Sequence, residues 1–193
     1  MFKVNSMSNY ILDDKELAFI PIAFKEMVKE EIRMGELKDS GERKVFETGA
    51  ARDISEGKGR CDLLPLDTIV YILTPLPSGT QQILEYINDF LKTGYIDSLR
   101  KAIIHFCDQK DWDSTTMLIE LSIHYEDGAR KYADNNWKKG MPVHCFINSG
   151  LRHYFKWLRG DEDEPHDRAF VWNLVGAIWT MENKPEFNDI SGY

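Results

Sequence analysis

The stretch around His124–Trp137 constrains the fold most, because it combines helical periodicity with an unusual density of polar groups. One stripe of the predicted helix is apolar and carries Leu118, Leu121, Tyr125, Ala129 and Tyr132. The roughly opposite face is polar and carries Glu120, His124, Asp127 and Lys131. A solvated surface helix is the simplest interpretation. Gly128, however, would weaken a purely structural helix by about 1 kcal/mol relative to alanine, and we therefore predict that this helix holds a polar ligand.

Further helices are predicted by apolar residues at helical spacing, around residues 81–92, 95–108, 143–158 and 164–183. The segment Asp111–Ser114 offers a plausible N-cap for the central helix. Glycines interrupt alternating cations and acids over residues 46–65, so this segment is predicted to be a loop. Within it, Lys58 and Arg60 are separated by glycine, which suits contact with phosphate oxygens, although from these residues alone a flexible basic turn is the simpler interpretation.

Length and composition indicate an ordinary globular protein. The chain has 193 residues, of which 42% are hydrophobic, and this is enough to bury one core, as one domain or as one domain with an insertion. No apolar run approaches the ~20 residues of a membrane span, and the N-terminus lacks the order of a signal peptide, so we expect a cytoplasmic protein without a membrane partner. The three cysteines are far apart and are expected to be free thiols. A net charge of −8 argues against a nucleic-acid backbone as partner but is compatible with a small phosphorylated ligand.

Two further helices carry polar clusters that complement the central helix. Ser149, Arg152, His153 and Lys156 share one arc of the helix at 143–158. Asn173 lies in an apolar run of the last helix, where a carboxamide without partners would cost about 1–3 kcal/mol. We therefore expect the three helices to enclose a charged cleft. In such a cleft carboxylates hold Mg²⁺ or Mn²⁺ and cations hold phosphates, which implies attack of an activated water on a phosphate chain.

An ordered set of motifs resembles one family. It comprises Glu47–Ala50 with Arg52 and Asp53, Gly57–Arg60, Asp62–Pro65, His124–Tyr132, Asn136 with Trp137, Arg152 with His153, Asp163, His166, and Trp172 with Asn173. In this order they resemble the phage dATP/dGTP diphosphohydrolases. The resemblance covers two blocks, residues 46–65 and 122–183, and implies an all-α helical bundle of MazG-like type, commonly a homo-oligomer, in the host cytoplasm if phage-encoded. The implied activity is Mg²⁺-dependent (or Mn²⁺-dependent) hydrolysis of purine deoxynucleoside triphosphates to the monophosphate and pyrophosphate.

The resemblance also implies roles for individual residues. The implied catalytic residues are Glu126, His153 and His166. The implied substrate-binding residues are Lys58, Arg60, Lys131, Asn136, Trp137, Arg152 and Asn173. The implied metal ligands are Glu126, Asp127 and Asp163. The paired acids of the MazG pattern are absent in recognisable form, and about 50 residues separate Pro65 from the central helix, where the family has a shorter link.

The predicted organisation is therefore an N-terminal helical region at 1–45, a hydrolase-like domain at 46–183 with an inserted helical segment at 66–115, and a poorly ordered tail at 184–193. Two alternatives to a hydrolase remain. One is a nucleotide-binding protein without turnover, such as a sponge for a signalling nucleotide. The other is a helical module that binds a host protein through residues 66–115.

Overall fold

The computed structural model describes residues 42–70 and 76–190 of the chain. All of these residues belong to one compact unit, Glu36–Tyr193, and the other unit spans Met1–Gly35. Apart from residues 42–45, the predicted N-terminal helical region lies outside the described residues.

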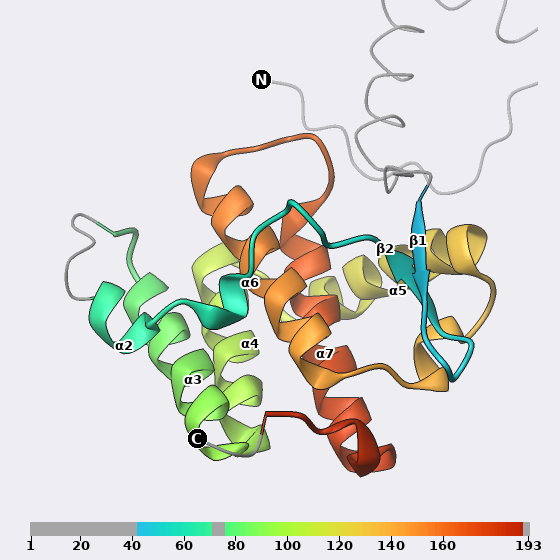
Figure 1. The fold of residues 1–193 in the computed structure, drawn as a ribbon. Coiled ribbons are helices and arrows are strands. Elements are labelled where there is room, and N and C mark those ends of the chain that lie inside the picture. The colour runs from blue at the N-terminus through green and yellow to red at the C-terminus, as the bar shows by residue number, and fades with distance from the viewer. Residues whose placement is uncertain (1–41, 71–75, 191–193) are drawn as a thin grey trace, which may run out of the picture. The chain divides into compact units, whose positions relative to one another are not determined.

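Helices dominate the described residues, which confirms the predicted all-α class (Figure 1). The α-helices are α2 (Leu66–Ile69), α3 (Thr80–Thr93), α4 (Ile96–Lys110), α5 (Ser114–Tyr132), α6 (Val143–Arg159) and α7 (His166–Asn183). Short 3-10 turns are η2 (Cys61–Leu63), η3 (Asn136–Lys139) and η4 (Pro185–Phe187). The side chain of Asp113 caps α5 by accepting a hydrogen bond from Thr116 N at 2.6 Å, within the predicted N-cap segment.

Helices α6 and α7 pack side by side at the centre, with α3 and α4 on one side and α5 on the other (Figure 1). Their approach depends on Gly176, because a Cβ at this position would lie 2.5 Å from Cε1 of Phe146. The segment 66–115 shares this core, since Ile83, Leu99 and Phe106 are fully buried in the same hydrophobic cluster. It is therefore an integral part of the fold.

Two segments are more ordered than the sequence predicted. Strands β1 (Arg43–Val45) and β2 (Ala51–Asp53) form an antiparallel pair, with Arg43 opposite Asp53. Strand β2 lies in residues 46–65, which were predicted as loop, and β1 lies at the end of the region 1–45, which was predicted as helical. The predicted tail is also structured as far as Ile190, which is 6% exposed. Backbone N of His144 donates to Asp189 at 3.0 Å, and this bond fixes the tail against the start of α6.

Helix α5 buries part of the apolar stripe predicted for it, since Leu121 is 7% exposed and Tyr125 packs against the core, but it also buries part of its polar face. Leu118 and Ile119 are 62% and 57% exposed, whereas His124 is only 5% exposed. The side chain of Lys131, on the predicted polar face, is 8% exposed. The polar face of α5 is thus turned inward, where the interior must supply polar partners or a ligand.

All three cysteines are free, as predicted. Within residues 42–70 and 76–190, no helix has both the length and the apolar character that a membrane crossing requires.

Candidate active site

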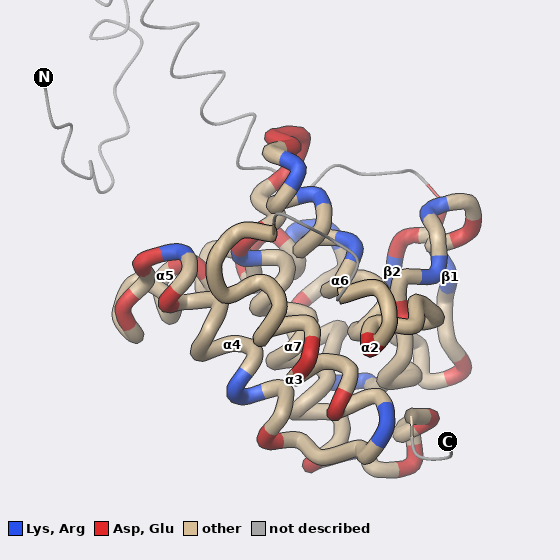
Figure 2. Tube along the Cα trace, turned by 90° about the vertical axis from the view of Figure 1, so that its left-hand side faces the viewer, with Lys and Arg blue, Asp and Glu red and all other residues tan. Residues whose placement is uncertain are grey.

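A cavity of about 1070 Å³ opens between α5, α6, the start of α7 and the strand pair. The loop before η2 closes one side with Lys58 and Arg60, and η3 contributes Trp137. Cations at the end of α6, Lys156 and Arg159, are followed by a run of acids in the connection to α7, Asp161–Glu164, beside this cavity (Figure 2). The cavity is large enough for a nucleotide and its lining is of mixed chemistry.

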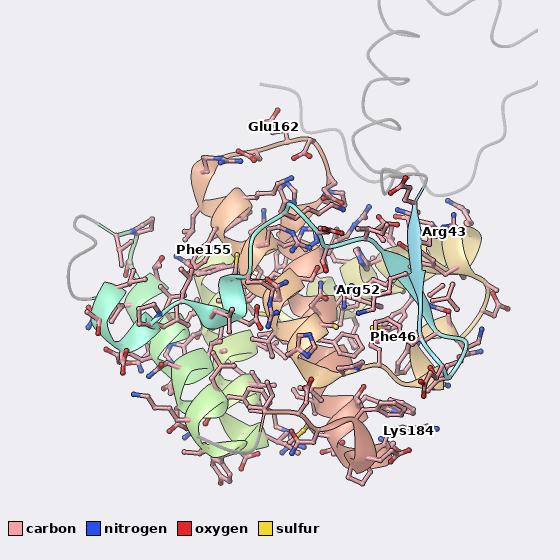
Figure 3. The ribbon with its side chains drawn as sticks, viewed as in Figure 1. Arg43, Phe46, Arg52, Phe155, Glu162 and Lys184 are labelled. Carbon is pink, nitrogen blue, oxygen red and sulfur yellow. The ribbon has the colours of Figure 1, made fainter. Side chains whose placement is uncertain are left out.

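Two arginines in the cavity lining have no acid partner. Arg52 projects from β2 toward α6 and α7 (Figure 3), where its Nη2 donates to Oδ1 of Asn173 at 2.6 Å. Arg152, on α6, donates from Nη2 to Oγ of Ser149 at 3.0 Å, and its Nη1 is buried without a partner among the described residues. Between residues 42–70 and 76–190, no carboxylate lies within ion-pair distance of either guanidinium. Such uncompensated cations favour an anionic ligand.

Burial lowers the pKa of both guanidiniums, that of Arg52 to about 10, so both remain charged at neutral pH. Each retains donors that a phosphate group can fill in a bidentate manner.

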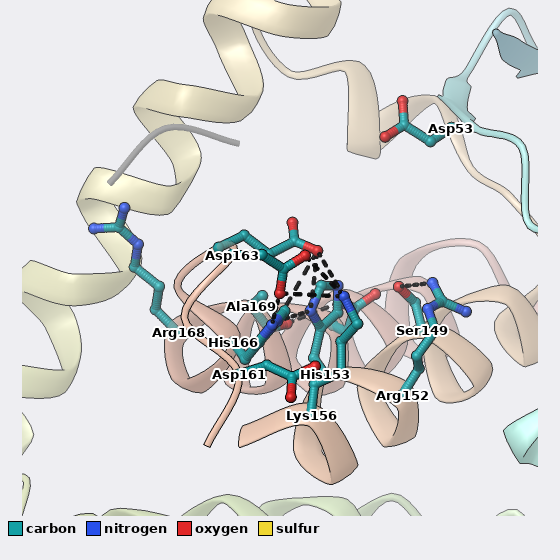
Figure 4. Close-up of polar contacts among 12 residues, drawn as sticks. Asp53, Ser149, Arg152, His153, Lys156, Asp161, Asp163, His166, Arg168 and Ala169 are labelled. Atoms are coloured by element: carbon teal, nitrogen blue, oxygen red, sulfur yellow. Dashed lines mark hydrogen bonds and ion pairs between the residues drawn. The ribbon is translucent and has the colours of Figure 1, made fainter. Parts of the chain in front are cut away.

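A chain of hydrogen bonds links the side chains of Asp163, His166 and His153 (Figure 4). His166 Nε2 lies 2.8 Å from Oδ1 of Asp163, and His166 Nδ1 lies 2.9 Å from Nδ1 of His153. Burial first, and then the nearby His166 and Arg152, keep the pKa of His153 well below its usual range. His153 is therefore neutral at neutral pH. Lys156 donates to Oδ2 of Asp163 at 3.0 Å and completes the cluster.

Acids and histidines with metal-ligand chemistry gather at this same place. Two overlapping groups have their donor atoms within 4.8 Å of one another: Asp161 with Asp163 and His166, and His153 with Glu164 and His166. Although burial alone would raise it, hydrogen bonds from Lys156 and His166 lower the pKa of Asp163 to about 2. Ionised carboxylates of this kind are the donors that Mg²⁺ and Mn²⁺ prefer.

Aromatic rings line another part of the cavity. Trp172 on α7 lies 6.1 Å from the ring of Tyr125 on α5, and Tyr125 lies 5.4 Å from Trp137 (centroid distances). All three rings contribute to the cavity lining. Flat apolar surfaces of this kind suit a nucleobase.

Polar contacts from distant segments hold the strand pair over the cavity. The amide of Asn136 binds both backbone groups of Ala51, accepting from its N at 2.9 Å and donating to its O at 2.8 Å. Asp53 accepts from Lys131 and from the hydroxyl of Tyr132, each at 2.7 Å. These bonds fix β2, and with it Arg52, against α5.

Most of the predicted site residues line this one cavity: Lys58, Arg60, Glu126, Lys131, Asn136, Trp137, Arg152, His153, Asp163 and Asn173. His166 is 2% exposed and lies behind His153. The structure places several of them in specific contacts. Asn136 and Lys131 bind the strand pair. The side-chain amide of Asn173 has the partners that a buried carboxamide requires, because it accepts from Arg52 and donates to the carbonyl of Ala169.

The predicted metal ligands do not come together. Asp127 does not line the cavity, since its carboxylate pairs with Arg168 at 3.2 Å and with Arg130 at 3.3 Å. Glu126 is largely exposed and also pairs with Arg130. Arginines thus hold the acids of α5, and the groups that gather around Asp163 come instead from α6, from the α6–α7 connection and from α7. Asp53 and Arg168 lie apart from this cluster (Figure 4).

The sequence argument assigned no role to Arg52, His124 or Asp161. The contact of Arg52 with Asn173 joins positions 121 residues apart, and no local sequence pattern predicts it. His124 was recognised on the polar face of its helix, but its burial depends on which face of that helix turns inward.

The fold and the cavity define an all-helical protein with a cationic and aromatic site beside an acid–histidine cluster, as expected of a nucleotide-binding protein. Residues 111–190 match the family model described as dATP/dGTP diphosphohydrolase, N-terminal. Over these residues the chain is similar to that family, which supports the predicted resemblance for α5, α6 and α7. The strand pair and the loop at 55–60 lie outside the match. No curated protein and no solved structure matches the chain.

Proposed function

We propose that the cavity binds a purine deoxynucleoside triphosphate and that the protein hydrolyses it, with Mg²⁺ or Mn²⁺, to the monophosphate and pyrophosphate. The observation that carries this proposal is the placement of two arginines without acid partners, Arg52 and Arg152, in one cavity with the Asp163–His166–His153 chain. The name of the family matched by residues 111–190 supports the choice of substrate.

The arginines bind the phosphates. Each charge-assisted hydrogen bond to a phosphate oxygen contributes about 1.5–3 kcal/mol, and both side chains already occupy a fixed position through Asn173 and Ser149. Lys58 adds an exposed cation at the cavity wall, and no acid pairs with it among the described residues. A triphosphate would supply negative charge for these three cations.

The histidine pair orients a general base. If His166 donates from Nε2 to Asp163, its Nδ1 accepts from Nδ1 of His153, and Nε2 of His153 is left with its lone pair. Neutral His153 then accepts the proton of the water whose oxygen attacks the α-phosphorus. The bond from the α-phosphorus to the bridging oxygen breaks, and pyrophosphate leaves.

The donor set also fits a divalent cation, because Asp161 and Asp163 supply ionised oxygens beside His166. When bound there, such an ion would stabilise the charge that develops on the phosphate chain. Lys156 pairs with Asp163 at 3.0 Å and also lines the cavity, where its ammonium group could contact a phosphate oxygen.

The test is product analysis with dATP and dGTP in the presence of Mg²⁺ or Mn²⁺. We expect deoxynucleoside monophosphate and pyrophosphate in equal amounts, no product after chelation, and recovery when the metal is restored. Asp163→Asn should lower turnover more than about 100-fold, because it removes both a metal oxygen and the partner of His166. Asp97→Asn, which changes an exposed acid on α4, is the matched control and should leave turnover unchanged. Absence of product from either purine nucleotide with both metals would refute the enzymatic proposal.

A nucleotide-binding protein without turnover is the second candidate, and one observation favours it. Three acids that line the cavity are each already paired with a cation of the chain: Asp163 with Lys156, Glu126 with Arg130, and Asp53 with Lys131. For such a protein the arginines would determine affinity, and Asp163→Asn would leave nucleotide binding nearly intact. Tight binding of dATP or dGTP without any product would establish it.

A further inference from the structure

His124 is the polar side chain whose burial the proposed chemistry does not explain. It lies in the middle of α5, is 5% exposed and contributes to the cavity lining. Its Nδ1 is buried and has no hydrogen-bond partner in the described part of the chain. No hydrogen bond to a described residue fixes the orientation of the ring. A buried polar group of this kind calls for a partner from outside the chain.

The ring is neutral at physiological pH. Burial first, and then the positive charges of Arg168 and Arg52, lower the pKa of His124 to about 3. A neutral imidazole carries one N–H donor and one acceptor, and it has no charge with which to hold a phosphate. Either ring nitrogen could pair with an uncharged polar group of a ligand.

The surroundings of His124 are those of a base rather than of a phosphate. Its ring lies 5.3 Å from Trp172, and Trp172 continues through Tyr125 to Trp137 as one aromatic wall of the cavity. A nucleobase lying against this wall would bring its polar edge toward the imidazole. The phosphates would then point toward Arg52, whose guanidinium lies 5.5 Å from the Phe146 ring.

We propose that the N–H of His124 donates a hydrogen bond to N7 of the purine base and thereby selects purine over pyrimidine nucleotides. This inference rests on the proposed function for the nature of the ligand. N7 is an acceptor in both adenine and guanine. Pyrimidine rings have no corresponding nitrogen, so one donor at this position accepts both purines without distinguishing between them.

The test compares dAMP and dGMP with their 7-deaza analogues, in which a C–H replaces N7. These monophosphates carry the base but no bond between phosphates, so binding is measured by calorimetry without turnover. We expect each natural monophosphate to bind about 3- to 10-fold more tightly than its analogue, as expected for one neutral hydrogen bond. His124→Phe should bind all four ligands with similar, weaker affinity. His124→Gln, which restores an N–H donor, should recover part of the preference.

His105→Phe is the matched control, because His105 on α4 lies outside the cavity lining and lies 3.4 Å from the hydroxyl of Tyr86. It should keep the full preference of the parent protein. Thermal unfolding of each variant verifies that it is folded. Equal binding of natural and 7-deaza ligands by the parent protein, or a preference that persists in His124→Phe, would overturn the inference. If the preference is found and dATP and dGTP give no product, the inference stands and the hydrolase fails; if no purine nucleotide binds, both fail.

Discussion

Replacing Arg152 by methionine should separate the effect of this side chain on stability from its effect on nucleotide binding. In the free protein the substitution removes the hydrogen bond to Ser149, which contributes about 1 kcal/mol. It also removes the buried and unpartnered Nη1, a donor whose burial costs about 1–3 kcal/mol. The two effects oppose each other, so we expect the free energy of unfolding to stay constant or to rise by up to about 2 kcal/mol.

Nucleotide binding should change in the opposite direction. A charge-assisted hydrogen bond from Arg152 to a phosphate oxygen contributes about 1.5–3 kcal/mol, and its loss weakens binding about 10- to 150-fold. A residue that lowers the stability of the free protein but strengthens ligand binding has a binding role.

The assay combines urea unfolding without nucleotide and titration with dGTP. Arg100→Met, on the exposed surface of α4, is the matched control for the loss of a guanidinium and should leave affinity unchanged. A variant at position 152 that loses more than about 2 kcal/mol of stability while binding dGTP normally would show that Arg152 is structural, contrary to the reasoning above.

Three further predictions follow from single contacts. Asp189→Asn should destabilise the protein most below pH 6.5 and have no effect on stability above about pH 9. Hydrogen bonds to Cys145 and Asp189 raise the pKa of His144 to about 9, and the stability that they add is lost as the pH rises through that value. Urea unfolding from pH 6 to 10 measures this effect. Gly128→Ala should raise thermal stability by about 1 kcal/mol and weaken dGTP binding, because Gly128 is helical, its Cβ would meet no protein atom, and the position lines the cavity; unchanged affinity would contradict the placement of the ligand. Gly176→Ala should destabilise by about 1–3 kcal/mol in chemical denaturation, since its Cβ would lie 2.5 Å from the ring of Phe146.

The helices were predictable from sequence because their signals are local. The periodicity of residues 143–158 anticipates α6, which spans Val143–Arg159, and Gly160 ends the helix in the left-handed conformation expected after a final arginine. Asn173 was identified as a carboxamide in need of partners by its apolar neighbours alone, and the structure supplies those partners. Such inferences need only the sequence within a few turns of helix.

The orientation of α5 was not predictable in the same way. An apolar stripe is buried only if an apolar partner faces it, and Leu118 is exposed among the described residues. The polar face turns inward because distant residues satisfy it: Asp53 accepts from Lys131 at 2.7 Å, and Arg168 reaches Asp127 at 3.2 Å. Pairings across 78 and 41 residues leave no local trace in the sequence.

The same polar pairing determines which wall of the cavity can move. The wall formed by α6 and α7 is held by buried aromatic and aliphatic packing, whereas β1 and β2 are held mainly by hydrogen bonds, including those of Asn136 to Ala51 and of Lys131 to Asp53. Every residue of β1 is exposed, and the apolar contacts of the strand pair with the core come from the turn between the strands, at Phe46 and Ala50. Segments with few apolar contacts open at a lower free energy than the core. Arg52 would move with this wall, and a triphosphate that binds Arg52 and Arg152 together would hold the wall closed.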